Sequence, residues 1–170
     1  VKTMSNRIIN IIEFKTEDLT HASSIIECIS NENNELDFNR LIPSPEYLKV
    51  LKEKNSSCHV DQDSDWNYKY WHSKWNAWHS EFKLEEKNEY VYGRIGFISF
   101  NNIPYPIFIA LSEKFHQIRF KVRFADQCDF GCDCGFLVFE NGQEIDRHTS
   151  PNAFESDEYY YWLDIAMSVC

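Results

Sequence analysis

The sequence predicts an α+β fold in which two helices cover one face of an antiparallel sheet, and three patterns point to it. Within residues 116–126, positions 118–124 alternate strictly between apolar and polar side chains, as in a strand with one buried face. Residues 16–30 repeat apolar side chains at helical spacing. The pair Asn141-Gly142 follows a short apolar run and is typical of a tight β-hairpin.

The first strand is expected at residues 5–14, which are rich in β-branched side chains. A helix follows at 16–30, where Thr16 is a suitable N-cap in front of Glu17 and Asp18. Its buried face is predicted from five apolar side chains: Leu19, Ala22, Ile25, Ile26 and Ile29.

Residues 30–64 are polar and interrupted by prolines, so we expect an insertion after the first helix. Within it, Ser44 as N-cap and Pro45 at the first helical position predict a short helix at 45–53.

Four of the five tryptophans lie in residues 65–78, and their spacing predicts a helix that begins near Asp65. One stripe of this helix would carry four aromatic side chains: Trp71, Trp75, Trp78 and Phe82. A narrow aromatic stripe is how a helix docks on a sheet, whereas a platform for stacking bases would place spaced aromatics among basic residues. We therefore expect the stretch to be core, and removal of Trp71 or Trp75 to destabilise the fold.

The remaining elements complete the sheet. Residues 89–102 are expected to form a strand or hairpin, and Pro104 marks the start of a second helix. With the strand and hairpin that follow, the order of elements matches a βαββαβ, ferredoxin-like arrangement. The chain of 170 residues is expected to be a single domain, residues 1–170, with residues 146–170 as a C-terminal extension.

The charge of the chain limits its partners. The formal net charge is −10 and the sequence pI is about 5.0. Affinity for nucleic acid depends on cations that neutralise phosphate, so we expect no direct contact with nucleic acid. No apolar run reaches the ~20 residues that a membrane span needs, and the first residues lack an apolar leader. We expect a cytoplasmic protein with no membrane contact.

Six cysteines, at positions 28, 58, 128, 132, 134 and 170, are expected to carry free thiols. Three of them, Cys128, Cys132 and Cys134, lie within seven residues and raise the alternative of a zinc site. The paired two-residue spacing of zinc knuckles is absent, so the preferred interpretation has no metal and no cofactor. Nucleophile, phosphate-loop and dinucleotide motifs are also absent, and we expect no catalytic residues and no enzyme activity.

Three segments together resemble a known family. "DFNRLIPSPEYL" at 37–48, "DWNYKYWHSKWNA" at 65–77, and "ALSEKFHQIRFKVRF" followed by "GFLVFENG" are similar to motifs of the YubB-like ferredoxin-fold family of phages, plasmids and mobile elements. That resemblance implies a ferredoxin-like fold and a mobile-element context. The family has no established activity, so it implies no reaction.

The function expected from these observations is that of a non-catalytic acidic binding protein of a phage or mobile element. Its partner would be a host protein with a basic surface, such as a nuclease or nucleoprotein complex, and the specific role suggested is inhibition of a nucleic-acid-guided defence nuclease. The alternative is a zinc-dependent nucleic-acid-processing accessory or enzyme that uses the cysteine cluster. The oligomeric state stays open. The expected partner-binding residues are Lys74, Asn76, Glu155, Asp157, Glu158, Tyr159 and Tyr160.

Overall fold

The computed structural model describes residues 5–53, 64–128, 131–151 and 156–170. Its elements are, in chain order, β1 (Arg7–Thr16), α1 (Leu19–Ile29), the 3-10 helix η1 (Phe38–Arg40), α2 (Pro45–Glu53), α3 (Ser64–Tyr70), β2 (Trp78–Lys87), β3 (Tyr90–Phe100), α4 (Tyr105–Lys114), β4 (Phe120–Asp126), β5 (Cys134–Glu140), β6 (Gln143–Thr149) and α5 (Ser156–Met167). Among the described residues, no helix is long and apolar enough to cross a membrane.

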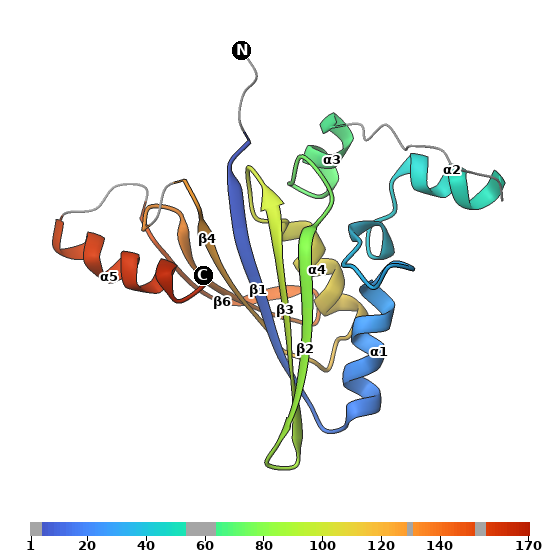
Figure 1. The fold of residues 1–170 in the computed structure, drawn as a ribbon, viewed down its shortest axis with the longest axis horizontal. Coiled ribbons are helices and arrows are strands. Elements are labelled where there is room, and N and C mark those ends of the chain that lie inside the picture. The colour runs from blue at the N-terminus through green and yellow to red at the C-terminus, as the bar shows by residue number, and fades with distance from the viewer. Residues whose placement is uncertain (1–4, 54–63, 129–130, 152–155) are drawn as a thin grey trace.

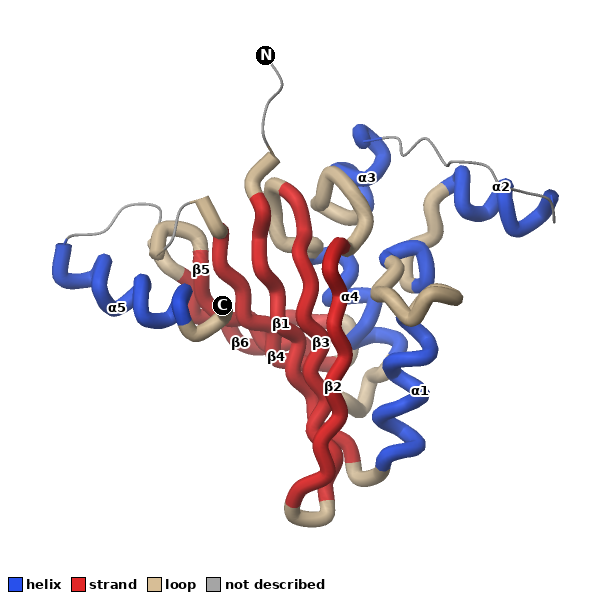
Figure 2. The backbone as a smooth tube through the Cα atoms, viewed as in Figure 1, coloured by secondary structure: helices blue, strands red, loops and turns tan. Residues whose placement is uncertain are grey.

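The strands form one sheet in the order β2-β3-β1-β4-β5-β6, and every neighbouring pair is antiparallel (Figure 2). The predicted α+β class is confirmed, and the sheet has six strands. Strand β1 lies inside the sheet, where ten of its residues pair with β3 and six pair with β4. The β-branched side chains of this segment suit a strand with neighbours on both sides.

Helices α1 and α4 pack against one face of the sheet, and α5 packs against the other (Figure 1). Alternate positions of β1, β3 and β4 point into the larger core under α1 and α4, among them Ile12, Ile95 and Val122, which are at most 1% exposed. The intervening positions point to the opposite face of the sheet, because side chains alternate along a strand. A smaller core under α5 includes Ile11 and Trp162.

The first helix has a different N-cap from the one expected. Asp18 caps α1, and its carboxylate accepts a hydrogen bond from the His21 backbone N–H at 2.7 Å. Thr16 is instead the last residue of β1, where its hydroxyl donates to the Asp18 carbonyl oxygen. Threonine and aspartate are both good N-caps. Because β1 continues two residues further than predicted, the helix starts later and Asp18 becomes the cap. The predicted buried face is confirmed except at Leu19, which is 46% exposed.

The helix predicted to begin near Asp65 is confirmed at its start, where α3 begins at Ser64, but its continuation through the tryptophans is wrong. Helix α3 ends at Tyr70, a turn follows in which His72 has φ of 59°, and β2 begins at Trp78. Trp71 is 1% exposed and belongs to the core, but Trp75 and Trp78 are 39% and 40% exposed. The interpretation of the whole stretch as core is therefore wrong for these two rings.

Strand β2 was not expected as a separate strand, and its pairing with β3 makes a hairpin. The two-residue loop Asn88-Glu89 has φ of 52° and 65°, as type I′ turns require. In β3, Gly93 lies directly under the ring of Phe14 from β1. A Cβ atom at position 93 would come within 2.1 Å of that ring, so any larger residue would have to displace the buried Phe14 side chain.

Two local predictions in the second half of the chain are confirmed. Asn141 and Gly142 have φ of 50° and 72° in the two-residue loop of the β5–β6 hairpin. The second helix, α4, starts after Pro104 as expected, and its apolar face buries Ile107, Phe108 and Leu111. In the insertion, Ser44 accepts a hydrogen bond from the Tyr47 backbone N–H at the start of α2, as predicted.

Candidate functional site

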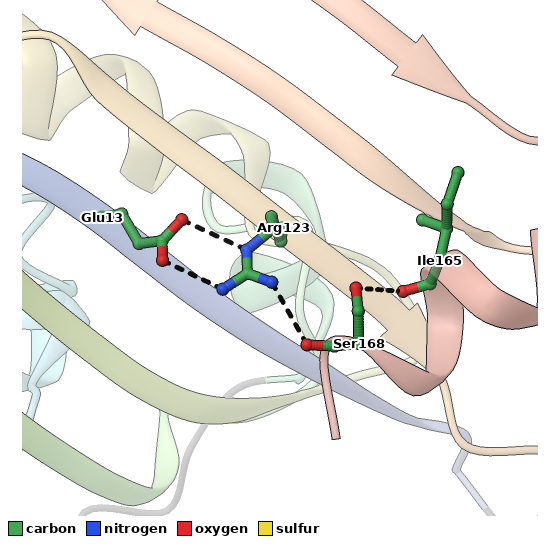
Figure 3. A network of polar contacts seen from close by, with 4 residues as sticks. All are labelled: Glu13, Arg123, Ile165 and Ser168. Atoms are coloured by element: carbon green, nitrogen blue, oxygen red, sulfur yellow. Dashed lines mark hydrogen bonds and ion pairs between the residues drawn. The ribbon is translucent and has the colours of Figure 1, made fainter.

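Helix α5 is attached to the sheet by an apolar face and by one arginine. Trp162 and Ala166 pack against Ile11 of β1 and Ala125 of β4. Arg123 of β4 donates to both carboxylate oxygens of Glu13, at 2.9 and 3.1 Å, and to the Ser168 carbonyl oxygen, at 3.1 Å (Figure 3). This arginine ties the end of α5 to β1 and β4. A fixed helix can present its outer side chains in a defined geometry.

The outer face of α5 is rich in exposed large side chains. Tyr160, Asp164 and Met167 are spaced at i, i+4 and i+7, so they share the side of the helix that faces away from the sheet. Tyr160 is 68% exposed and Met167 is 62% exposed. Tyr161 is 52% exposed, but its hydroxyl lies 2.7 Å from Nε2 of His148, which holds it toward β6. We call Tyr160, Asp164 and Met167 the outer α5 face. Glu158 is also exposed, but it lies four residues before Trp162 and therefore on the other side of the helix.

The structure describes some, but not all, of the expected partner-binding residues of the C-terminal segment. Glu158 and Tyr160 are exposed, and Tyr159 is 38% exposed with its ring centroid 5.7 Å from that of Tyr160. Glu155 and the side chain of Asp157 lie outside the described residues. Asp164 was not predicted from the sequence, although its helical spacing from Tyr160 could have identified it.

The other two expected residues lie between α3 and β2 and have structural contacts. Asn76 accepts hydrogen bonds from the backbone N–H groups of Phe38 and Ala77, at 2.8 and 2.9 Å, and donates to Asp37 at 2.7 Å. These bonds join η1 to the start of β2. The ammonium of Lys74 lies 3.3 Å from the Ser5 hydroxyl and 4.6 Å from the Trp75 ring centroid. Neither set of contacts tests binding to a partner.

The two exposed tryptophans form an aromatic cluster that the sequence did not predict. Trp75 contacts the ring of Phe100 edge-on at 4.8 Å, and Trp78 lies 6.0 Å from the same ring. The guanidinium of Arg7 is 4.8 Å from the Trp78 ring centroid, a cation–π distance. These side chains, with Asn76 and Ala77, line a surface cavity of about 430 Å³.

The segment from Cys128 to Cys134 provides no metal site among the described residues, where no group of three or more His, Cys, Asp or Glu side chains could hold an ion. Cys134 is buried, and its Sγ donates to the Trp162 carbonyl oxygen at 3.4 Å, while Cys128 is exposed. Burial raises the pKa of the Cys134 thiol. Since zinc binds thiolate, this environment opposes a ligand role for Cys134.

We expect an alkylating reagent to distinguish these two cysteines. Because its pKa is raised, Cys134 stays a protonated thiol at pH values where an ordinary cysteine is already partly ionised. The packing of α5 also blocks access to it. Iodoacetamide at about pH 8 should therefore label Cys128 and leave Cys134 unmodified in the folded protein. Peptide mass spectrometry measures both sites, and urea-unfolded protein, labelled at both, is the control. Equal labelling in the folded state would contradict the position of α5.

One further polar cluster joins α4 to β6. Arg147 forms two hydrogen bonds to the Glu144 carboxylate, both at 2.7 Å, and these bonds lower the pKa of Glu144. Burial and the neighbouring Glu144 raise the pKa of Tyr105. Tyr105 also packs edge-on against Phe139 in the core. These contacts give the cluster a structural role at the helix–sheet junction.

Comparison with known proteins adds one distant structural likeness. No protein-family model matches the chain, and no curated protein matches it. A crystal structure of a protein api92 from Yersinia pseudotuberculosis, assigned to DUF1281, is similar over 70% of this chain with 14% sequence identity and a TM-score of 0.49. The match spans 41% of the length of that protein.

Proposed function

We propose that this protein is a non-catalytic binding protein that attaches to a partner protein through the outer α5 face. The observation that carries the proposal is the exposure of Tyr160 and Met167 on a helix whose opposite side is packed in a core. Tyrosine and methionine are enriched at protein interfaces, because they bury a large area and tyrosine also offers a hydroxyl. A helix anchored on its inner side loses little freedom when its outer side is covered.

The charge of the same face defines the partner. Asp164 is exposed beside the two large side chains, and the whole chain carries a net charge of −10. Long-range attraction therefore favours a partner with a basic surface and speeds the encounter. Nucleases and nucleoprotein complexes have such surfaces, and the resemblance to a mobile-element family makes inhibition of a host defence nuclease in the cytoplasm the specific role that we propose.

We further propose that β1–β4 with α1 and α4 are a ferredoxin-like core. The strand order β2-β3-β1-β4 and the two helices, which follow β1 and β3 along the chain, support this assignment. The β5–β6 hairpin then extends the sheet beyond β4, and α5 covers part of that extension. In this arrangement the proposed binding helix belongs to the added elements.

A charge-reversed double variant of α5 tests the proposed function. Tagged wild-type protein is expected to capture a basic host protein from a lysate, and the affinity of the purified pair is then measured by biolayer interferometry. Tyr160→Ala/Asp164→Lys should weaken that binding by about thirtyfold or more, because it removes an interface anchor and reverses a charge. Raising the salt concentration should slow association with the wild type.

The matched control changes the same kinds of side chain elsewhere. Glu27→Lys/Leu51→Ala alters an exposed carboxylate on α1 and a side chain on α2 that is 57% exposed. Its binding should equal that of the wild type. The proposal would be overturned if the α5 variant captured the partner as well as the wild type does. It would also be overturned if the partner bound the α5 variant and the control variant equally weakly.

A further inference from the structure

A second surface lies on the sheet face opposite α1 and α4, beside the part that α5 covers. We call it the open sheet face and define it by six side chains: Glu13, Lys15, Lys83, Tyr92, Arg94 and Lys121. They come from β1, β2, β3 and β4 and line a cavity of about 810 Å³. The expectation of no contact with nucleic acid depended on the charge of the whole chain, and this face differs from that average.

The open sheet face is locally cationic. Five cations and three carboxylates line the cavity, on a chain whose total charge is −10. Two of the carboxylates are already paired with arginines: Glu13 with Arg123, and Glu140 with Arg119 at 2.8 Å. Outside these pairs, several cations line the cavity against a single carboxylate, that of Glu85.

One pair of cations is placed where it costs stability. Lys83 of β2 and Arg94 of β3 are direct cross-strand partners, and both are exposed. Like charges at directly opposite positions destabilise a sheet. In the part of the chain that the structure describes, neither forms an ion pair. A bound anion would remove this repulsion, so the arrangement favours a polyanionic ligand.

Exposed aromatic rings accompany the cations along β3. Tyr92 is 41% exposed, and the ammonium of Lys15 lies 5.8 Å from its ring centroid. Eight residues further along β3, about 26 Å away, Phe100 supports the exposed rings of Trp75 and Trp78. Between them lies Gly96, where an added Cβ would meet no atom within 4 Å. The face thus has rings at both ends, cations beside them, and open space between.

We propose that the open sheet face and the Trp75–Trp78 cluster at the far end of β3 bind single-stranded nucleic acid. Cations that follow a phosphate backbone and spaced rings that stack on bases are the features shared by single-strand binders. Lys83 and Arg94 would contact phosphates, and Tyr92, Trp75 and Trp78 would stack on bases. An acidic peptide would use the cations but would leave the rings unstacked. This site is separate from the outer α5 face and is independent of the function proposed for it.

The test is a fluorescence-anisotropy titration with a labelled oligothymidylate of about 12 nucleotides at low salt. The wild type should bind, and Lys83→Ala/Arg94→Ala should bind at least about tenfold more weakly. Its log–log salt slope should be smaller by about 1.4, which is two phosphate contacts at about 0.7 each. The control Lys49→Ala/Lys52→Ala removes two exposed cations of α2 and should bind like the wild type.

A second variant blocks the face without removing a cation. Gly96→Glu places a charged side chain in open space, so the fold should persist while binding is lost; Gly96→Ala should bind normally. The proposal is overturned if the wild type does not bind the oligonucleotide, or if Lys83→Ala/Arg94→Ala and Gly96→Glu both bind as it does. It is also overturned if a polyglutamate peptide binds more tightly at the same salt, because the face would then be a site for acidic protein segments.

Discussion

Trp71→Ala is expected to lower the free energy of unfolding by about 3–5 kcal/mol. Trp71 is 1% exposed, and its ring contacts Phe38 and Trp66 edge-on, with centroid distances of 5.7 and 5.4 Å. Its indole N–H donates to the Ile42 carbonyl oxygen at 2.9 Å. Truncation therefore leaves both a large cavity and an unpaired carbonyl, at the point where η1, α3 and the segment before α2 meet.

Urea unfolding monitored by far-UV circular dichroism measures this loss without depending on tryptophan fluorescence. Trp75→Ala is the matched control, because Trp75 lies four residues along the chain but is 39% exposed. We expect it to cost about 1 kcal/mol, since much of its area is already in water. Equal losses for the two variants would contradict the structure and would favour the single aromatic stripe that the sequence predicted.

The elements predicted correctly are those whose signal is local. Helix α2 begins at Pro45 and α4 begins directly after Pro104, and the β5–β6 turn contains Asn141-Gly142, which adopts positive φ at low cost. Strand β4 alternates between buried and more exposed side chains from Phe120 to Phe124. In each case neighbouring residues in the chain decide the conformation, so no knowledge of distant contacts was needed.

Strand β2 and the end of α3 were missed because their signals conflict. The aromatic spacing from Trp71 to Phe82 matches a helix, but α3 ends at Tyr70 and His72, with φ of 59°, turns the chain away. A residue other than glycine rarely adopts a positive φ, and nothing in the sequence marks His72 as one that does. The alternation of Phe82 and Leu84 before the Asn88-Glu89 turn was the signal that could have identified the strand.

The candidate site was predicted only in part for a related reason. The exposed tyrosines of α5 follow from helical spacing, whereas the structural role of Asn76 depends on η1, 38 residues away. The open sheet face collects residues from four strands, and the opposition of Lys83 to Arg94 depends on pairing register. Register is set by which face of each strand is buried, and β2 had not been identified as a strand.

Gly135→Ala is expected to lower the free energy of unfolding by about 3 kcal/mol or more. Gly135 has φ of 143°, a region open to glycine and strained for other residues. A Cβ atom there would lie 2.2 Å from the His148 carbonyl oxygen and 2.7 Å from Cα of Thr149, both in β6. These are backbone atoms, so the paired strand itself must move.

Gly96→Ala separates this effect from a general cost of replacing a strand glycine. Position 96 is also in a strand, but an added methyl meets no atom within 4 Å, so the midpoint temperature of thermal unfolding should be unchanged or slightly raised.

The two substitutions should also differ in partner binding. Cys134, next to Gly135, bonds to the Trp162 carbonyl of α5, and displacement of the β5–β6 edge therefore loosens that helix. Gly135→Ala should weaken capture of the partner through α5, and Gly96→Ala should not. Normal stability for Gly135→Ala would mean that β5 and β6 do not pair in this register.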